Sequence, residues 1–445
     1  DYGLSKLQLV YYPKDNETDK KLVIIPISKS NFDQFISAFP NNLVVKDGVS
    51  YDLYFEVFDN DAVNKSKSTK SNVFSYRKRT KDEEEQKQLQ EQNQTVKDLN
   101  KSLEKFDKQQ KELQELSKTQ KEKSELNFND KKKFENFLKR QKEQEQMMKQ
   151  FNKKLKDNLD EFQKDNKEED QFKEDLKQRL KDNEEQLKQD EKLLEELEKL
   201  KEKFSKEQFS EKLDNLAKKA KSQKRSLEQL VELTKRYYVT KKMEKISNDL
   251  DKLAKEQDKL ANSKDDQNTK EKQDQINKQF EALQKQLEDL EKDNQDLKNP
   301  MDVPRDKNNE ENIKEEQQEA SQNLQEKEAS QDAQQKKDKQ QSAKQKQKSA
   351  AQKMKKMSQS MQMQMAGAAQ EQLEEDIAML RQILDNLVIF SMDEEALMKQ
   401  FKSIEINHNE YANYLKKQKE LRTHFEHVDD SLFAISLRQP KFSED

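Results

Sequence analysis

The strongest constraint on the fold of this chain is a long segment without helix breakers. Between residues 81 and 299 the sequence contains neither glycine nor proline, and lysine, glutamate, glutamine and leucine dominate. These residue types favour the α-helix. Leu89, Val96 and Leu103 recur every seven residues beside a second series, Leu99, Phe106 and Leu113. This alternating three-and-four spacing is that of a coiled-coil seam and predicts coiled-coil helices over residues 80–299.

The same narrow apolar stripe recurs further along the segment, at Leu176, Leu180, Leu187, Leu194 and Leu197, at Leu227, Leu230 and Leu233, at Ile246, Leu250 and Leu253, and at Phe280, Leu283, Leu287 and Leu290. One uninterrupted helix of this span would be roughly 330 Å long, so we expect interruptions. Asn129-Asp130 and the capping-box sequence at 205–208 mark two possible restarts. We expect several helices of roughly 30 to 80 residues, folded back as antiparallel hairpins or self-associated, because a lone stripe cannot bury itself.

Residues 1–79 differ in composition from everything that follows. They contain two of the three glycines and three of the six prolines, with β-branched and aromatic runs at 7–12, 22–25, 51–58 and 73–76. Asp47-Gly48 is a turn signal before the third run. We expect four or five short strands in a small immunoglobulin-like β-sandwich head, either whole or lacking an upstream strand. The predicted fold class is therefore mainly α, a long coiled-coil or helical-hairpin rod with this small head.

The sequence beyond residue 299 divides into three parts. Prolines at 300 and 304 make the clearest break in the chain, and residues 300–350 are so polar that they predict a linker or a solvated helix. Residues 351–404 predict a methionine-rich and apolar helix, and we expect its strongly apolar part, 371–404, to be buried against more than one neighbour. Residues 405–445 predict a C-terminal amphipathic helix that ends near Pro440.

Composition limits the classes of partner and compartment. Charged residues make up 40% of the chain, and 87 basic against 91 acidic side chains leave a net charge of −4, so no global field favours nucleic acid. The absence of cysteine leaves the redox compartment open. No apolar run approaches the ~20 residues that span a bilayer. Because the sequence starts with Asp1 and no signal peptide, we expect a soluble processed product or C-terminal fragment.

The sequence carries no recognisable catalytic motif. Three widely separated glycines cannot build a phosphate-cradling loop, and neither a cysteine nor a nucleophile-elbow sequence is present. With 91 acidic residues, choosing one acid–base pair would be arbitrary. We therefore expect no enzyme, no catalytic residues and no cofactor.

Two clusters could in principle hold a metal ion. Asp59 and Asp61 with Asn64 resemble the oxygen-rich turns that bind Ca²⁺ between sandwich domains. We favour the alternative, an Asx-type turn. His424 and His427 lie three residues apart, on one helical face, but two ligands without a third make a poor site. The sequence therefore predicts no metal centre.

The methionine cluster is the least ordinary feature of the chain. Alternating methionines at 361, 363 and 365 could bind Cu(I) or offer an adaptable apolar surface, but we favour simple packing beside the 371–404 helix. If this region instead binds a protein, the candidate partner-binding residues are Met354, Met357, Met361, Leu380, Leu384, Leu387 and Phe390.

Five segments, in this order, resemble an uncharacterised bacterial envelope family, domain of unknown function forty-one seventy-five. They are YDLYFEVFDNDAVN at 51–64, SLEQLVELTKRYYVTKKMEKISNDLDKLAKEQDKLA at 226–261, NPMDVP at 299–304, AAQKMKKMSQSMQMQM at 350–365 and EEDIAMLRQILDNLVIFSMDEEALM at 374–398. The resemblance implies a protein anchored in the inner membrane by transmembrane helices that precede this part, with further sandwich domains and with its helices in the periplasm. It implies no catalytic residues.

These features together predict a non-enzymatic structural protein. We expect a helical rod of the bacterial cell envelope that spaces or assembles partner proteins, through self-association or with envelope components, and one form of this hypothesis is a part of a secretion or motility machine. The expected location is the periplasmic side of the inner membrane, with membrane attachment only through a segment absent from this chain. Two alternatives stay open: a periplasmic holdase-type chaperone with helical arms, and a cytosolic coiled-coil tether.

Overall fold

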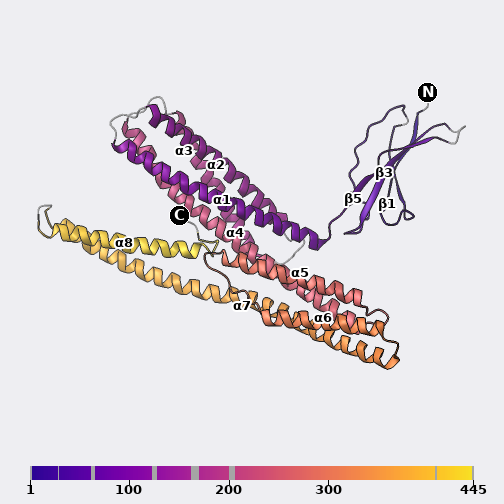
Figure 1. The fold of residues 1–445 in the computed structure, drawn as a ribbon. Helices are drawn as coiled ribbons and strands as arrows, with labels where there is room; N and C mark the ends of the chain where they lie inside the picture. The colour runs from indigo at the N-terminus through magenta and orange to yellow at the C-terminus, as the bar shows by residue number, and fades with distance from the viewer. Residues whose placement is uncertain are drawn as a thin grey trace. The chain divides into compact units, whose positions relative to one another are not determined.

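The computed structural model describes residues 3–28, 30–61, 66–122, 128–161, 170–199, 206–405 and 408–442. It is 73% helical, which confirms a mainly α protein with a small N-terminal β head (Figure 1). The described strands are β1 (Leu4–Pro13), β2 (Lys21–Ile25), β3 (Ser50–Asp59), β4 (Ser68–Lys70) and β5 (Phe74–Arg77). The described helices are α1 (Lys81–Glu122), α2 (Phe128–Glu161), α3 (Gln171–Lys199), α4 (Lys206–Asn262), α5 (Lys270–Gln295), α6 (Lys307–Ala329), α7 (Ala333–Lys402) and α8 (Tyr411–Ser436). The chain divides into two compact units, residues 1–90 and 91–445.

The head is built on one antiparallel sheet. Its strand order is β2-β1-β3-β4, and β5 pairs with the first half of β3. Leu9 lies opposite Val23 on one side and Phe55 on the other, so the alternating apolar residues gather on one face. Phe39, Leu43 and Val45, from the connection between β2 and β3, pack on this face. The described strands thus form a single sheet covered by coil, where the immunoglobulin-like expectation had two sheets.

A capping box starts the first helix. The backbone N–H of Glu83 donates to Thr80 Oγ1 at 3.2 Å, and the backbone N–H of Thr80 donates to the Glu83 carboxylate at 2.9 Å. Arg77 also donates to both carboxylate oxygens of Glu83, at 2.8 and 3.0 Å. These hydrogen bonds lower the pKa of Glu83 to about 2, and those from Arg77 contribute most. The cap therefore stays charged, and the helix start stays fixed, far below neutral pH.

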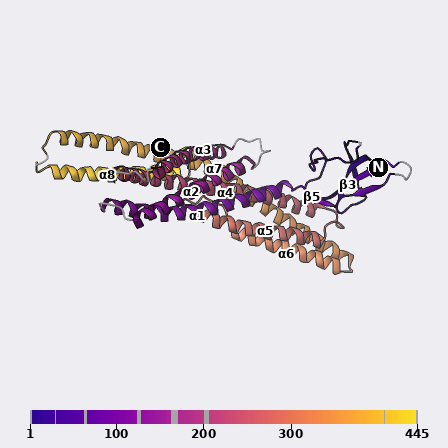
Figure 2. The same ribbon diagram turned by 90° about the horizontal axis from the view of Figure 1, so that it is seen from above.

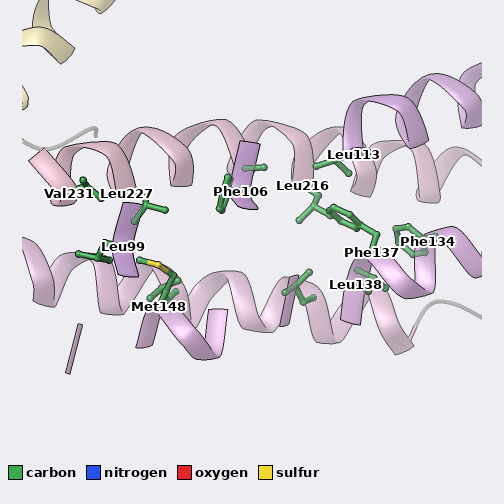
Figure 3. Close-up of a cluster of buried hydrophobic side chains, with 13 residues drawn as sticks. Leu99, Phe106, Leu113, Phe134, Phe137, Leu138, Met148, Leu216, Leu227 and Val231 are labelled. Atoms are coloured by element: carbon green, nitrogen blue, oxygen red, sulfur yellow. The ribbon is translucent and has the colours of Figure 1, made fainter. Parts of the chain in front are cut away.

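Helices α1, α2, α3 and α4 share one apolar core. Leu99 and Phe106 of α1, Phe137 of α2, Leu194 of α3 and Leu227 of α4 belong to the same buried cluster (Figure 3). A second cluster extends it with Leu159, Leu176 and Leu233, contributed by α2, α3 and α4. The apolar stripes of four helices therefore bury one another, in what we call the first bundle.

Helix α4 continues into a second bundle with α5, α6 and α7. α4 packs along α5 and α7, and α6 packs along α5 and α7, so the four helices close a ring of contacts. The buried series on α5, which includes Phe280, Leu283, Leu287 and Leu290, is the stripe that the sequence predicts. α4 thus belongs to both bundles, as the ribbon shows in both views (Figures 1 and 2).

Residues 300–350 form part of the second bundle, which corrects the prediction of a linker or a solvated helix. Ala343 and Ala350 are fully buried, and so are the amides of Gln347 and Gln273. Gln347 Nε2 donates to Gln273 Oε1 at 2.8 Å. Small alanines let the helices approach closely, and paired amides satisfy one another inside the bundle. A segment almost without large apolar residues can therefore be buried.

Paired hydrogen bonds close the proline-containing turn between α5 and α6. The side chain of Asn294 donates to the Met301 carbonyl at 2.7 Å and accepts from the Met301 backbone N–H at 2.9 Å. α6 then starts at Asp306, whose carboxylate accepts from the Asn309 backbone N–H at 2.9 Å. The predicted break at 299–304 is therefore a fixed reversal of the chain.

Candidate protein-interaction surface

A small, partly open cavity lies inside the first bundle. It holds about 20 Å³ and is lined by Phe106, Gln144, Glu145, Asp190 and Gln223, among others. That volume fits about one water molecule, not a substrate. Burial, and then the charges of Asp190 and Glu191, raise the pKa of Glu145 to about 8. The cavity therefore contains a carboxyl group that is mostly neutral at pH 7, without a histidine, serine or lysine in its lining.

The candidate calcium ligands lie at the end of β3. Asp59 Oδ1 accepts the backbone N–H of Asp61 at 3.2 Å and that of Lys67 at 2.8 Å, as in an Asx-type turn. Asn64 lies outside the described residues. Across the described ranges, no three His, Cys, Asp or Glu side chains come together as a possible metal site, and this includes His424 and His427.

The methionine candidates lie in the interior of the second bundle. Met354, Met357 and Met361 are 0%, 8% and 2% exposed. Their place among the partner-binding candidates is therefore wrong for the chain as it stands, because a buried thioether cannot meet a partner. Next to them Met363 is 75% exposed, as its position on another face of the helix requires.

The second half of α7 pairs with α8 as an antiparallel hairpin. Ile383 of α7 and Val428 and Ile435 of α8 form its core. The rings of Phe390 and Phe425 lie 5.2 Å apart. Nearer the tip of the hairpin, Gln418 donates to Glu394 at 2.8 Å. These contacts fix the register of the two helices.

Buried polar contacts hold the base of the hairpin, where α8 ends. Arg438 Nη2 and Asp376 Oδ1 lie 2.7 Å apart, and both side chains are less than 10% exposed. Gln439 donates to the other oxygen of Asp376 at 2.6 Å. From α4, Arg225 donates to Asp429 at 2.6 Å and to Asp430 at 3.0 Å. The C-terminal part of α8 is thus held both to α7 and, through α4, to the first bundle.

A second apolar stripe on the hairpin is exposed. On α7 it contains Leu373 (49% exposed), Ile377 (41%), Leu384 (61%), Val388 (48%) and Met398 (46%), and on α8 it contains Leu415 (52%) and Phe425 (47%). We call these seven residues the hairpin face. Exposed apolar residues are common singly, but a contiguous set along one element marks an interaction surface.

Helical geometry places all seven residues on one side of the hairpin. Leu373, Ile377, Leu384 and Val388 follow three- and four-residue steps, displaced by about a quarter turn from Ile383, which faces α8. Phe425 and Leu415 are displaced in the same rotational sense from Val428, which faces α7. In an antiparallel pair, equal displacements on the two helices lead to the same side. The hairpin face is therefore one continuous surface.

The expectation that the 371–404 helix is buried against more than one neighbour is wrong for its outer part. Beyond the base, the described residues of α7 pack on α8, and nothing else described covers the hairpin face. Of the remaining partner-binding candidates, Leu384 lies on this face, Leu380 and Leu387 pack partly buried beside Ile383, and Phe390 contacts Phe425. The structure thus brings one of the seven candidates onto the exposed stripe.

Six residues of the hairpin face are apolar in the sequence but were not singled out as partner-binding: Leu373, Ile377, Val388, Met398, Leu415 and Phe425. The sequence did contain a signal for an exposed surface: α7 carries two apolar stripes, and a single partner helix can cover only one. Which stripe remains exposed depends on the register between α7 and α8. Tertiary packing sets that register, and the periodicity of α7 alone does not show it.

Within the described residues, we find no helix with an apolar stretch of the length that a bilayer-spanning segment needs. Comparison of the chain with family models, curated proteins and solved structures gave no match.

Proposed function

We propose that this protein is a non-enzymatic assembly scaffold that binds a protein partner through the hairpin face. One observation carries the proposal: seven large apolar side chains are exposed in a continuous stripe on an otherwise strongly polar chain. Water contact at these side chains is unfavourable by about 25 cal/mol per Å² of apolar surface, and a partner that covers them removes that cost.

The two bundles suit a scaffold mechanically. They are long helices packed side by side, and α4, with 57 residues, belongs to both. A helix that is shared by two bundles transmits the position of one to the other without a flexible joint. The proposed mechanism is therefore steric: the bundles set the position of the hairpin face, and the face holds the partner.

The envelope location is part of the same proposal. It rests on the resemblance to the bacterial envelope family, which implies helices in the periplasm beyond a membrane anchor. A part in a secretion or motility machine is one form of this role. A cytosolic tether with the same hairpin face would differ in location but not in its way of binding.

A holdase-type chaperone is the second candidate, because an exposed apolar stripe also suits non-native clients. The two roles differ in selectivity. A scaffold binds one partner in one register, whereas a holdase binds many unfolded chains.

In-cell photo-crosslinking tests the proposed function. A photoreactive amino acid replaces Leu384 in the full chain, in cells that normally express the protein, and mass spectrometry identifies the products. The matched control carries the same group at Met363, which is exposed on the same helix but outside the hairpin face. The proposal predicts one defined adduct from position 384 and none from position 363. A spread of adducts to many proteins would support the holdase, and equal yields from the two positions would contradict both roles.

A further inference from the structure

We propose that the occupant of the hairpin face is the hairpin face of a second copy of this chain, and that the two hairpins pack antiparallel as a four-helix bundle. This inference rests on the proposed function and names its partner. The first half of α7 already lies in a bundle of four helices, whereas its second half has one partner along most of its length. A second hairpin supplies the two missing helices and presents the same kind of surface.

The position of the hairpin face suits a closed twofold contact. Leu384 lies near the middle of the series that runs from Leu373 at the base to Met398 at the tip. If a twofold axis passes near Leu384, the base of each hairpin lies beside the tip of the other. The seven residues of the face are then covered by one second copy, while Ile389 (58% exposed) and Met392 (66%) of α7 lie outside this contact.

The charges along α8 select the antiparallel arrangement. Its first half carries four cations, Lys416, Lys417, Lys419 and Arg422, against one acid, Glu420, and its second half carries Glu426, Asp429 and Asp430. In an antiparallel pair, the basic half of one α8 lies beside the acidic half of the other. A parallel pair would instead bring the two acidic bases together, which like-charge repulsion opposes.

The charges along α7 also favour the antiparallel arrangement. Its base carries Glu371, Glu374 and Glu375, and its end carries Lys399 and Lys402. The stretch between them also contains Asp393, Glu394 and Glu395, so the end of α7 is less basic than the start of α8. The acidic base of one hairpin is therefore attracted most strongly to the basic start of α8, at the tip of the other hairpin. Within the chain, Arg225 offsets part of the acidic charge on α8, at Asp429 and Asp430, and Arg438 lies 3.6 Å from the Glu375 carboxylate of α7.

Sedimentation velocity over a range of concentrations tests the association of the full chain. We expect a reversible monomer–dimer equilibrium, and we expect Leu384→Glu to weaken it at least about tenfold, because the new charge is buried without a partner. Met363→Glu, on the same helix, leaves the dimer unchanged. Circular dichroism of each variant checks that the helices persist. A chain that stays monomeric at every concentration, or a dimer indifferent to Leu384→Glu, overturns the inference.

Cysteine cross-linking tests the orientation, because the natural chain contains no cysteine. With a short bis-maleimide, Leu384→Cys is expected to form cross-linked dimers by itself. Met398→Cys is expected to form them only when mixed with Leu373→Cys chains. If Met398→Cys instead cross-links to Leu415→Cys of a second chain, the hairpins are parallel and the antiparallel arrangement is wrong. A monomer that still gives one defined adduct from position 384 in cells would reject this partner and leave the proposed function standing.

Discussion

At the scale of single residues, Glu145 is the most consequential side chain of the first bundle. Its side chain is 5% exposed, and burial raises its pKa to about 8, aided by the charges of Asp190 and Glu191. The pKa in the unfolded chain is near 4.5. Between these two values the folded chain keeps a proton that the unfolded chain has lost. The contribution of Glu145 to stability is therefore greatest below pH 4.5 and falls as the pH rises towards 8.

Replacement of Glu145 by glutamine removes this pH dependence. Glutamine resembles the protonated acid in shape but cannot ionise. We expect Glu145→Gln to match the natural chain near pH 5 and to be more stable by about 1–3 kcal/mol near pH 8.5, where the buried carboxylate is charged. Urea denaturation at the two pH values, followed by circular dichroism, measures the difference. The same gain at both pH values would contradict the assigned pKa.

At the scale of helices, paired amides hold α4, α5, α6 and α7 together. Gln273 of α5 donates to Gln257 of α4 at 2.9 Å and accepts from Gln347 of α7 at 2.8 Å. Gln317 of α6 donates to the same Gln257 at 3.2 Å. One chain of amides thus crosses all four helices of the second bundle.

Substitution of the central amide tests this role. We expect Gln273→Leu to destabilise the second bundle by about 1–3 kcal/mol, because Gln257 and Gln347 lose buried partners. Gln279→Leu, at an exposed position of the same helix, is the control and is expected to change stability by less than about 0.5 kcal/mol. Thermal unfolding of the two variants gives the comparison. An equal effect of the two substitutions would show that the amide chain does not hold the bundle together.

The helices differ in how far the sequence could predict them. The stripes on α1 and α5 were readable because large apolar residues recur at helical spacing, and the restart near Asn129-Asp130 lies within two residues of the start of α2. The turn between α4 and α5 was not predicted, although the Asn262–Thr269 segment is rich in Asn, Ser and Asp, which favour turns. The burial of α6 and the first half of α7 was missed for another reason: amides and alanines become core residues only when they meet one another, and a single sequence does not show which ones meet.

The same limit applies to the hairpin face. The apolar excess of the 371–404 helix was correctly seen, and a partner was expected for it. Sequence periodicity could not show that α8 covers only the side around Ile383 and leaves Leu384 exposed. The methionines at 354, 357 and 361 lie on an equally helical spacing, but they are buried where α7 packs along α4 and α6. On α7, the helices packed beside a residue decide whether it is buried or exposed, and the helical spacing of the residue does not.

At the scale of the whole molecule, α7 is one helix in two environments. Over residues 343–361 it is enclosed by the second bundle, and over residues 380–402 it has α8 on one side and the exposed hairpin face on the other. A helix with fewer buried contacts opens more readily, so its amide hydrogens exchange faster with solvent. The account therefore depends on a contrast within a single 70-residue helix.

Hydrogen–deuterium exchange of the dilute full chain, read by mass spectrometry along α7, measures this contrast directly. The account predicts that amides in residues 380–402 exchange at least about tenfold faster than those in 343–361, and that this difference shrinks as the protein concentration rises and the hairpin face is covered. Slow exchange that is uniform along α7 in the dilute chain would mean that the face is already buried, and would contradict the account.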